Sequence, residues 1–376
     1  MNESPPTRSD LIGRLTGSGP KRILALDGGG IRGVITLCLL ERLEEVLRKV
    51  NRNPDLRLAD YFDLIGGTST GAIIAAGLSI GMTTAEMGAA YRELGASILS
   101  RRKVKVWQSL LDENPLRDGL HRYFGKIKMG DPDIRTGLCI VAKRADTNST
   151  WPIHNHPDGK FYGENRSLLL REVVRASAAA PFFFVPEKLD IGGGNRGLFV
   201  DGAISLSDNP AWLLFSVATL KGYSFRWSTG ADRLLLVSVG TGSWPWETDL
   251  RQRKNKKSWD WILSVPQMMM KDASEQTELL LQYLSRSPTA RHIDGEVGSL
   301  DEDLLTGEPA LSYLRYNVSL DKATLERLGL KNLEDRLGDI QNMASTKSVD
   351  ALTRIGTASA KQICPDHFPA VFNLGA

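Results

Sequence analysis

Tyr61-Phe-Asp-Leu-Ile-Gly-Gly-Thr-Ser-Thr-Gly-Ala-Ile-Ile-Ala-Ala-Gly77 is the stretch of sequence that decides the fold. Its apolar start predicts a short buried strand that two glycines end, and its small apolar residues predict a helix. Ser69 lies at the break between them, flanked by Gly67 and Gly71. A G-x-S-x-G pattern between a strand and a helix is typical of a nucleophile elbow, a tight turn that exposes the serine hydroxyl at a helix N-terminus.

The same pattern occurs a second time, as Gly77-Leu-Ser79-Ile-Gly81. This copy falls at the end of the helix that the first copy begins, and no strand precedes it. We therefore interpret the second copy as a coincidence of a glycine-rich sequence. The alternative for Ser69 itself is a tight turn without chemistry.

Composition limits the class of protein. Apolar residues make up 41% of the 376 residues and charged residues 24%, which is ordinary for a globular protein with a sizeable core. The net charge of +3 is too small to indicate a nucleic-acid partner. Three well-separated cysteines have neither disulfide nor metal-ligand spacing, so we expect a reduced, cytoplasmic protein without a bound metal.

The sequence predicts one folded domain preceded by a short N-terminal arm. Residues 1–20 are polar and lack the apolar segment of a secretory signal, and we expect them to form a flexible arm. No stretch of 18 apolar residues occurs, so no membrane-spanning helix is expected. Residues 21–376 are expected to form a single domain, in which 258–376 is mainly helical.

Short apolar runs recur along the chain and alternate with helical patterns. The runs at 21–26, 138–142 and 234–239 predict buried strands. Such alternation indicates an α/β fold, with a mostly parallel sheet covered by helices on both faces.

A glycine run, Asp27-Gly-Gly-Gly-Ile-Arg-Gly33, follows the first predicted strand. Gly28, Gly30 and Gly33 match G-x-G-x-x-G, the fingerprint of a dinucleotide-binding Rossmann-type protein. That fingerprint needs an acidic residue at the end of the next strand, whereas the nearby acids come before that strand or at its start. Dinucleotide binding is therefore the weaker alternative.

The glycine run has a second use, because loops after neighbouring parallel strands meet at one edge of a sheet. Backbone N–H groups of Gly28, Gly29 and Gly30 are then placed to bind the oxyanion that forms when Ser69 attacks an ester. Arg32 either orients this loop, binds a substrate phosphate, or forms an ordinary surface ion pair.

A nucleophilic serine also needs a base. None of the five histidines follows a convincing core strand, although an order of Ser69, Asp201 and then His292 or His367 is formally allowed. Asp201 follows the apolar run 198–200 and precedes a Gly-Ala pair. It is placed to act as the base directly, without histidine; the alternative is an aspartate that caps a turn.

Together these motifs resemble those of the patatin-like phospholipase family. Asp27-Gly-Gly-Gly-Ile-Arg-Gly33 is similar to the family's D-G-G-G-x-R-G, Gly67-Thr-Ser-Thr-Gly71 to its G-x-S-x-G, and Asp201-Gly-Ala203 to its D-G-A/G. The spacings, 69 − 27 = 42 and 201 − 69 = 132, are similar too. Arg175-Ala-Ser-Ala-Ala-Ala-Pro181 resembles a further block of the family.

The resemblance implies a three-layer patatin-like sandwich and hydrolysis of phospholipid or lysophospholipid acyl esters. It implies Ser69 as nucleophile, Asp201 as base, an acyl-serine intermediate, the glycine loop as oxyanion hole, and no cofactor. Compact bacterial members of the family include effectors that cyclic nucleotides activate in anti-phage defence. This chain is similar to them in length, so a cyclic-nucleotide activator is an open alternative.

Two Trp-x-Trp pairs bracket a basic run after residue 242. Tryptophan and basic side chains favour a bilayer interface, where each basic residue near an anionic surface adds about 1 kcal/mol. We predict a membrane-facing segment that holds the protein peripherally at the inner face of the membrane when it is active. The alternative is a solvated loop with tryptophans in the core. The residues concerned are Trp244, Trp246, Arg251, Arg253, Lys254, Lys256, Lys257, Trp259 and Trp261.

Overall fold

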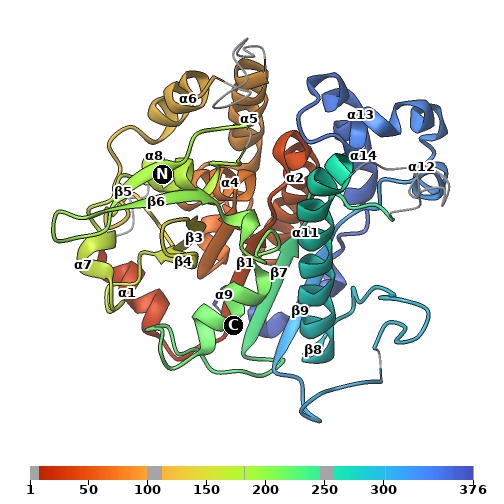
Figure 1. Ribbon diagram of the computed structural model, residues 1–376. Coiled ribbons are helices and arrows are strands. Elements are labelled where there is room, and N and C mark those ends of the chain that lie inside the picture. Colours follow the sequence, from red (N-terminus) through yellow and green to blue (C-terminus); the bar gives the residue numbers. More distant parts are fainter. Residues whose placement is uncertain (1–7, 100–111, 182, 246–257, 301, 376) are drawn as a thin grey trace.

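A central sheet of nine strands organises the structure, a computed structural model that describes residues 8–99, 112–181, 183–245, 258–300 and 302–375 (Figure 1). The strand order is β5-β6-β3-β2-β1-β7-β9-β8, and β4 pairs with β3 outside this path. The strands β3, β2, β1, β7, β9 and β8 run parallel to their neighbours in that order. Their bounds are β1 Lys21–Leu26, β2 Leu64–Thr68, β3 Gly137–Arg144, β7 Leu234–Val239, β8 Ser285–Arg286 and β9 Leu311–Tyr316.

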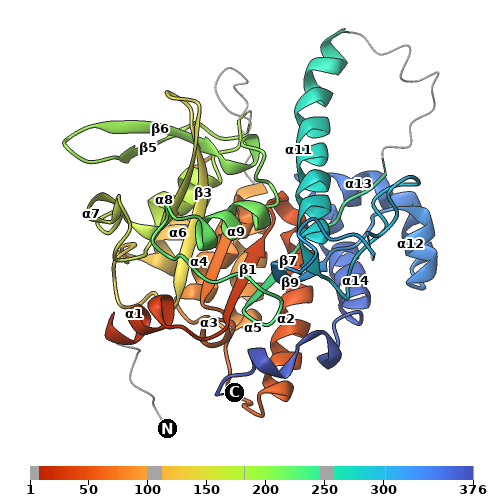
Figure 2. The same ribbon diagram turned by 90° about the horizontal axis from the view of Figure 1, so that it is seen from below.

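The antiparallel part of the sheet lies at one edge. There β5 (Glu187–Asp190) and β6 (Arg196–Asp201) form a hairpin that projects from the body of the sheet (Figures 1 and 2). β6 and β4 (Ser149–His154) both pair with β3. The hairpin brings the end of β6 back toward the centre of the sheet, where β2 ends.

Helices cover both faces, as the alternation of side chains in β1 illustrates. Leu24 and Leu26 enter the larger core, beneath α2, α4, α5, α6, α8 and α14, whereas Ile23 and Ala25 enter the smaller core, beneath α1, α9 and α11. α9 crosses in front of the strands in Figure 2. The predicted α/β fold with a mostly parallel sheet between two helical layers is confirmed.

The helices have these bounds: α1 Arg8–Thr16, α2 Gly33–Val50, α3 Leu58–Tyr61, α4 Thr70–Ser79, α5 Thr84–Leu99, α6 Asn114–Phe124, α7 Tyr162–Asn165, α8 Leu170–Ser177, α9 Ala211–Thr219, α11 Ser258–Tyr283, α12 Lys322–Arg327, α13 Leu337–Gln341 and α14 Val349–Ala360. Short 3-10 turns are η1 Gly30–Arg32, η2 Gly202–Ile204, η3 Lys331–Arg336, η4 Thr346–Ser348, η5 Pro365–His367 and η6 Ala370–Phe372. Among the described residues, no helix is both long and apolar enough to cross a bilayer.

The expectation of a flexible arm over residues 1–20 is wrong for the part that the structure describes. Arg8–Thr16 is a helix whose Leu15 is fully buried, and the Trp227 indole N–H donates to the Leu15 carbonyl at 2.7 Å. The Arg14 guanidinium donates to the carbonyls of Ala59, Asp60 and Phe62. One buried leucine and one multiply bonded arginine thus fix a segment whose composition suggested a coil; residues 1–7 lie outside the described part.

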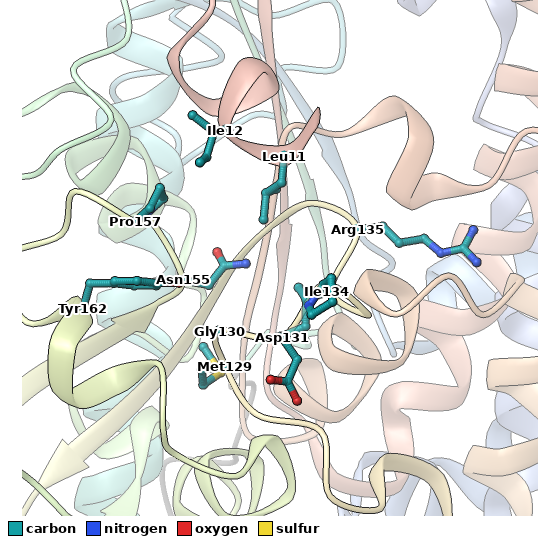
Figure 3. A pocket seen from close by; sticks show the side chains of 11 residues that line it. Leu11, Ile12, Met129, Gly130, Asp131, Ile134, Arg135, Asn155, Pro157 and Tyr162 are labelled. Atoms are coloured by element: carbon teal, nitrogen blue, oxygen red, sulfur yellow. The ribbon is translucent and has the colours of Figure 1, made fainter. Parts of the chain in front are cut away.

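A small pocket lies between α1 and the residues against which it packs. Figure 3 shows Leu11 and Ile12 extending from α1 toward the loop that carries Met129 and Ile134. The pocket holds about 10 Å³, enough for one water molecule and too little for a substrate. We therefore interpret it as a packing gap.

The C-terminal region is mainly helical, as expected, but it also supplies a strand that the sequence analysis missed. β9 is buried along its whole length and pairs with β7. The strand was missed because it contains polar residues that are buried only through partners elsewhere in the fold. Ser312 donates to the Ala231 carbonyl, and Arg315 pairs with two buried carboxylates.

Candidate active site

Ser69 occupies the turn between β2 and α4, as the sequence predicts. Its backbone has φ +55° and ψ −120°, a strained conformation for a residue with a side chain. The neighbouring glycines are required by close packing: a Cβ on Gly67 would lie 2.3 Å from the Gly71 backbone, and one on Gly71 would lie 2.2 Å from the Leu26 carbonyl oxygen. The turn is therefore a nucleophile elbow in its geometry.

Asp201 meets Ser69 although 132 residues separate them. The Ser69 Oγ donates to Asp201 Oδ2 at 2.6 Å, while Asp201 Oδ1 accepts from the Ala203 N–H at 2.9 Å. Asp201 ends β6, where it pairs with Ala142 of β3, the strand beside β2. The antiparallel return of β6 thus delivers the carboxylate to the end of β2.

Burial raises the pKa of the Asp201 carboxyl to about 6, since only 3% of the residue is exposed. Hydrogen bonds from the Ser69 hydroxyl and the Ala203 N–H, and the charge of Arg175, offset part of that rise. The carboxylate is therefore mostly ionised at pH 7, yet it is a better proton acceptor than an exposed aspartate.

The glycine loop is fastened by its carbonyl groups. The Gly28 carbonyl accepts from the Thr241 Oγ1 at 2.8 Å, and the Gly29 carbonyl accepts from the Arg32 Nε at 3.3 Å. In a trans peptide the N–H points away from the carbonyl of the same unit. The N–H groups of Gly29 and Gly30 are thus turned away from these anchors, and both residues line the cavity that contains Ser69.

The prediction that the Gly28 N–H binds the oxyanion is wrong, because this N–H already has a partner. It donates to the Asp208 carbonyl at 3.0 Å and is not free for a substrate. Two of the three predicted donors, Gly29 and Gly30, have no acceptor among the described residues.

Arg32 orients the loop, which is one of the three roles that the sequence left open. Its side chain is buried, and besides Gly29 it donates to the Gly242 carbonyl at 3.3 Å. The guanidinium lies 4.8 Å from the centroid of the Trp244 ring, which itself packs against the larger core. The surface ion pair is excluded for this buried guanidinium. Trp244 is half-buried, and its predicted role at a membrane stays a prediction.

Replacing Thr241 with valine is expected to lower kcat about tenfold and to change KM little. The Gly28 carbonyl then loses its hydrogen bond, so the peptide unit that carries the Gly29 N–H is no longer held in one orientation. Esterase kinetics measure this split. Thr219→Val is the matched control, since it removes a hydroxyl whose one partner in the described part of the chain is the Phe215 carbonyl within α9. Wild-type kcat in Thr241→Val would show that the loop holds its shape without this bond.

A cavity of about 730 Å³ opens beside Ser69 and Asp201. Most of its wall is apolar, and the side chains that form this apolar wall are Ile31, Ile73, Leu94, Leu116, Pro181, Phe183, Phe184, Ile204, Leu206, Pro266, Met269, Met270 and Met343. A cavity of this size and character suits an acyl chain. Phe183 and Phe184 line the cavity, and Phe184 also packs against the larger core.

Several supporting residues escaped the sequence analysis. The Tyr91 hydroxyl donates to the Gly30 carbonyl, and Ser177 accepts from the Ser69 N–H while donating to the Val141 carbonyl. Thr241 was within reach of prediction, because it follows β7, the strand beside β1. Nothing local in the sequence ties Tyr91 to the loop.

No histidine among the described residues lines the cavity, so the Ser–Asp–His alternative gains no support. His367 instead contacts the Tyr316 hydroxyl through Nδ1 at 2.9 Å. The dinucleotide alternative is also disfavoured: β2 ends in Thr68 rather than an acid, and the Ile31 N–H is committed to the Met343 carbonyl.

The structure describes only part of the predicted membrane segment. Trp246, Arg251, Arg253, Lys254, Lys256 and Lys257 lie outside the described residues. Trp259 and Trp261 fall in the first turns of α11, of which only the backbone is described.

Comparison with known proteins adds the following. A family model described as Patatin-like phospholipase matches residues 24–215. Patatin-2-Kuras 1 of Solanum tuberosum is 30% identical and covers 76% of this chain and 79% of its own. Patatin of the same plant is 29% identical, over 76% of this chain and 77% of its own. The crystal structure of VipD from Legionella pneumophila matches with 13% identity and a TM-score of 0.36, over 86% of this chain and 66% of that one.

Proposed function

The chain belongs to the patatin-like phospholipase family of lipid acyl hydrolases, and from this we propose that it cleaves glycerolipid acyl esters with Ser69 and Asp201. The observation that carries the proposal is the 2.6 Å hydrogen bond between these two side chains on the wall of a mostly apolar cavity. The proposed substrates are phospholipids or lysophospholipids. The reaction is then of the phospholipase A or lysophospholipase type.

In the first half of the reaction, the Ser69 Oγ attacks the ester carbonyl carbon while its proton passes to Asp201 Oδ2. The carbonyl oxygen becomes an oxyanion that accepts from the N–H groups of Gly29 and Gly30. When the tetrahedral intermediate collapses, the C–O bond to the alcohol breaks, and the alcohol oxygen takes the proton from Asp201. An acyl-serine ester remains.

In the second half, water attacks the acyl carbon and gives its proton to Asp201. A second oxyanion forms in the same loop, and its collapse returns the proton to the Ser69 oxygen as the fatty acid leaves. Asp201 therefore acts alternately as base and acid, a task that suits a carboxyl with a pKa of about 6.

The test is release of free fatty acid from vesicles of phosphatidylcholine, and from lysophosphatidylcholine, measured by mass spectrometry. Release by the folded wild-type protein supports the proposal, and the relative rates identify the preferred substrate. Failure to release fatty acid from any glycerolipid would contradict it.

Peripheral membrane contact is proposed for the mouth of the cavity. The lining residues Ile204, Leu206 and Met269 are 49%, 70% and 57% exposed there. Val265, which directly precedes the lining residue Pro266 on α11, is 44% exposed. We call these four residues the apolar rim; α11 packs against η2, which brings its two halves together. The basic run that the sequence predicts as membrane-facing directly precedes α11.

The double variant Leu206→Ser, Met269→Ser is expected to weaken binding to anionic vesicles at least tenfold, because each side chain gains about 1.5–3 kcal/mol when buried in an apolar phase. Sedimentation with vesicles measures the loss. Leu220→Ser is the control: Leu220 is 54% exposed but does not line the cavity. Equal sedimentation of the double variant and the wild type would refute this contact.

A cyclic-nucleotide activator, a role in anti-phage defence and a location at the inner face of the membrane stay predictions of the resemblance to compact bacterial family members. The described residues add no support to them.

A further inference from the structure

The strap between η2 and α9 carries a carboxyl group that the proposed reaction does not use. The Ser207 carbonyl accepts from the Thr68 Oγ1 at 2.6 Å, and the Asp208 carbonyl accepts from the Gly28 N–H at 3.0 Å. These bonds fasten the strap between the ends of β2 and β1. Because these bonds involve backbone carbonyls of the strap, a substitution of the Asp208 side chain leaves them in place.

The Asp208 side chain lies beside the nucleophile. It lines the same cavity, and a Cβ on Gly28 would be 2.3 Å from Asp208 Oδ1 and 3.4 Å from the Ser69 Cβ. The carboxyl thus lies against Gly28, whose carbonyl shares a peptide unit with the Gly29 N–H proposed to bind the oxyanion.

The Asp208 carboxylate has charged neighbours. Among the described residues, no donor or ion pair contacts its carboxylate. The charged groups that face it are Asp201, a like charge, and two cations, Arg32 and Arg315. Arg315 is bound to Asp27 and Glu278, and Arg32 to backbone carbonyls.

We propose that Asp208 is a second acidic residue of the active site, and that its negative charge opposes oxyanion formation at Gly29 and Gly30, so that the enzyme is fastest when this carboxyl is neutral. The inference rests on the proposed function. Inside a mostly apolar cavity, a fixed negative charge near the developing oxyanion raises the barrier, just as a positive dipole lowers it.

The two carboxyls titrate in the same pH range. Burial raises the pKa of Asp208 to about 6, and the negative charge of Asp201 adds to the rise. Burial likewise raises the pKa of Asp201 to about 6. Below this range Asp201 is protonated and cannot act as base; above it Asp208 is charged. The wild-type profile of kcat/KM is then bell-shaped, with limbs that belong to the coupled pair.

Asp208→Asn tests the proposal because it removes the charge and keeps the shape. Two results are expected: the alkaline limb disappears, and kcat/KM at pH 8 rises about tenfold. The acid limb, which belongs to Asp201, persists, because Asp208 is already neutral in that pH range. Asp208→Glu is the matched control, which keeps the charge and the alkaline limb. Profiles use a soluble ester between pH 4.5 and 9.

A ratio of Asp208→Asn to wild type that is constant with pH, or a slower variant at pH 8, would overturn the inference while leaving the proposed function intact. A wild-type protein without esterase activity at any pH would overturn both. If the variant fails to fold, inhibition of the wild type by an alkyl trifluoromethyl ketone decides, since its serine adduct is an oxyanion. The inhibitor is expected to bind more weakly at pH 8 than at pH 6; equal or tighter binding at pH 8 would overturn the inference.

Discussion

Ser69→Ala is expected to reduce fatty-acid release at least about 10⁴-fold, because without the hydroxyl no acyl-enzyme forms and only binding and the oxyanion hole remain. The fold should persist. The substitution deletes one oxygen, whose only described partner is Asp201. The packing around the strained backbone of the turn stays the same. Initial rates, together with a thermal melt that matches the wild type, measure this result.

Ser79→Ala is the matched control, because it alters the serine of the second G-x-S-x-G copy. Ser79 is fully buried at the end of α4, and the Ala76 carbonyl, one turn earlier, is the only acceptor of its hydroxyl among the described residues. Its replacement should leave the rate within about twofold of the wild type. An active Ser69→Ala variant, or an inactive but folded Ser79→Ala variant, would assign the chemistry to the wrong serine.

Asp201→Asn is expected to lower kcat by about 10³–10⁴-fold with little change in KM. The amide keeps the size of the carboxyl and an oxygen that accepts from the Ala203 N–H, but it cannot take the serine proton. Stopped assays at substrate saturation separate kcat from KM.

Asp190→Asn provides the comparison for that variant. Asp190 ends β5 of the same hairpin, is exposed, and accepts from the Gly192 N–H. Its activity should equal that of the wild type. If Asp201→Asn kept more than a tenth of the wild-type kcat, a base other than Asp201 would have to be found, and His292 and His367 would return as candidates.

The parts of the site that the sequence predicts share one property: each depends on a local pattern at the end of a strand. Gly67 and Gly71 mark the elbow because no Cβ fits beside the neighbouring backbone. Asp201 was predicted because it ends an apolar run. Loops that follow adjacent strands meet at one edge of the sheet, so such patterns can be combined without knowing the packing.

The parts that the sequence does not predict depend on distant partners. β9 contains Arg315, which pairs with Asp27 across 288 residues of sequence, so a buried strand resembled a polar segment. Gly28 resembled its glycine neighbours, but the strap at Asp208 takes its N–H. α1 resembled a polar arm because Leu15 and Arg14 make their contacts with residues distant in the sequence. In each case long-range contacts outweigh local composition.

The covalent intermediate is the central claim, and active-site labelling tests it most directly. The wild-type protein is treated with a fluorophosphonate, digested, and analysed by mass spectrometry to find the modified residue. The account predicts a single phosphonylated peptide that carries the label on Ser69 and is lost in Ser69→Ala but retained in Ser79→Ala. Labelling of Ser79 or another residue, or no labelling of a folded and lipid-hydrolysing protein, would contradict it.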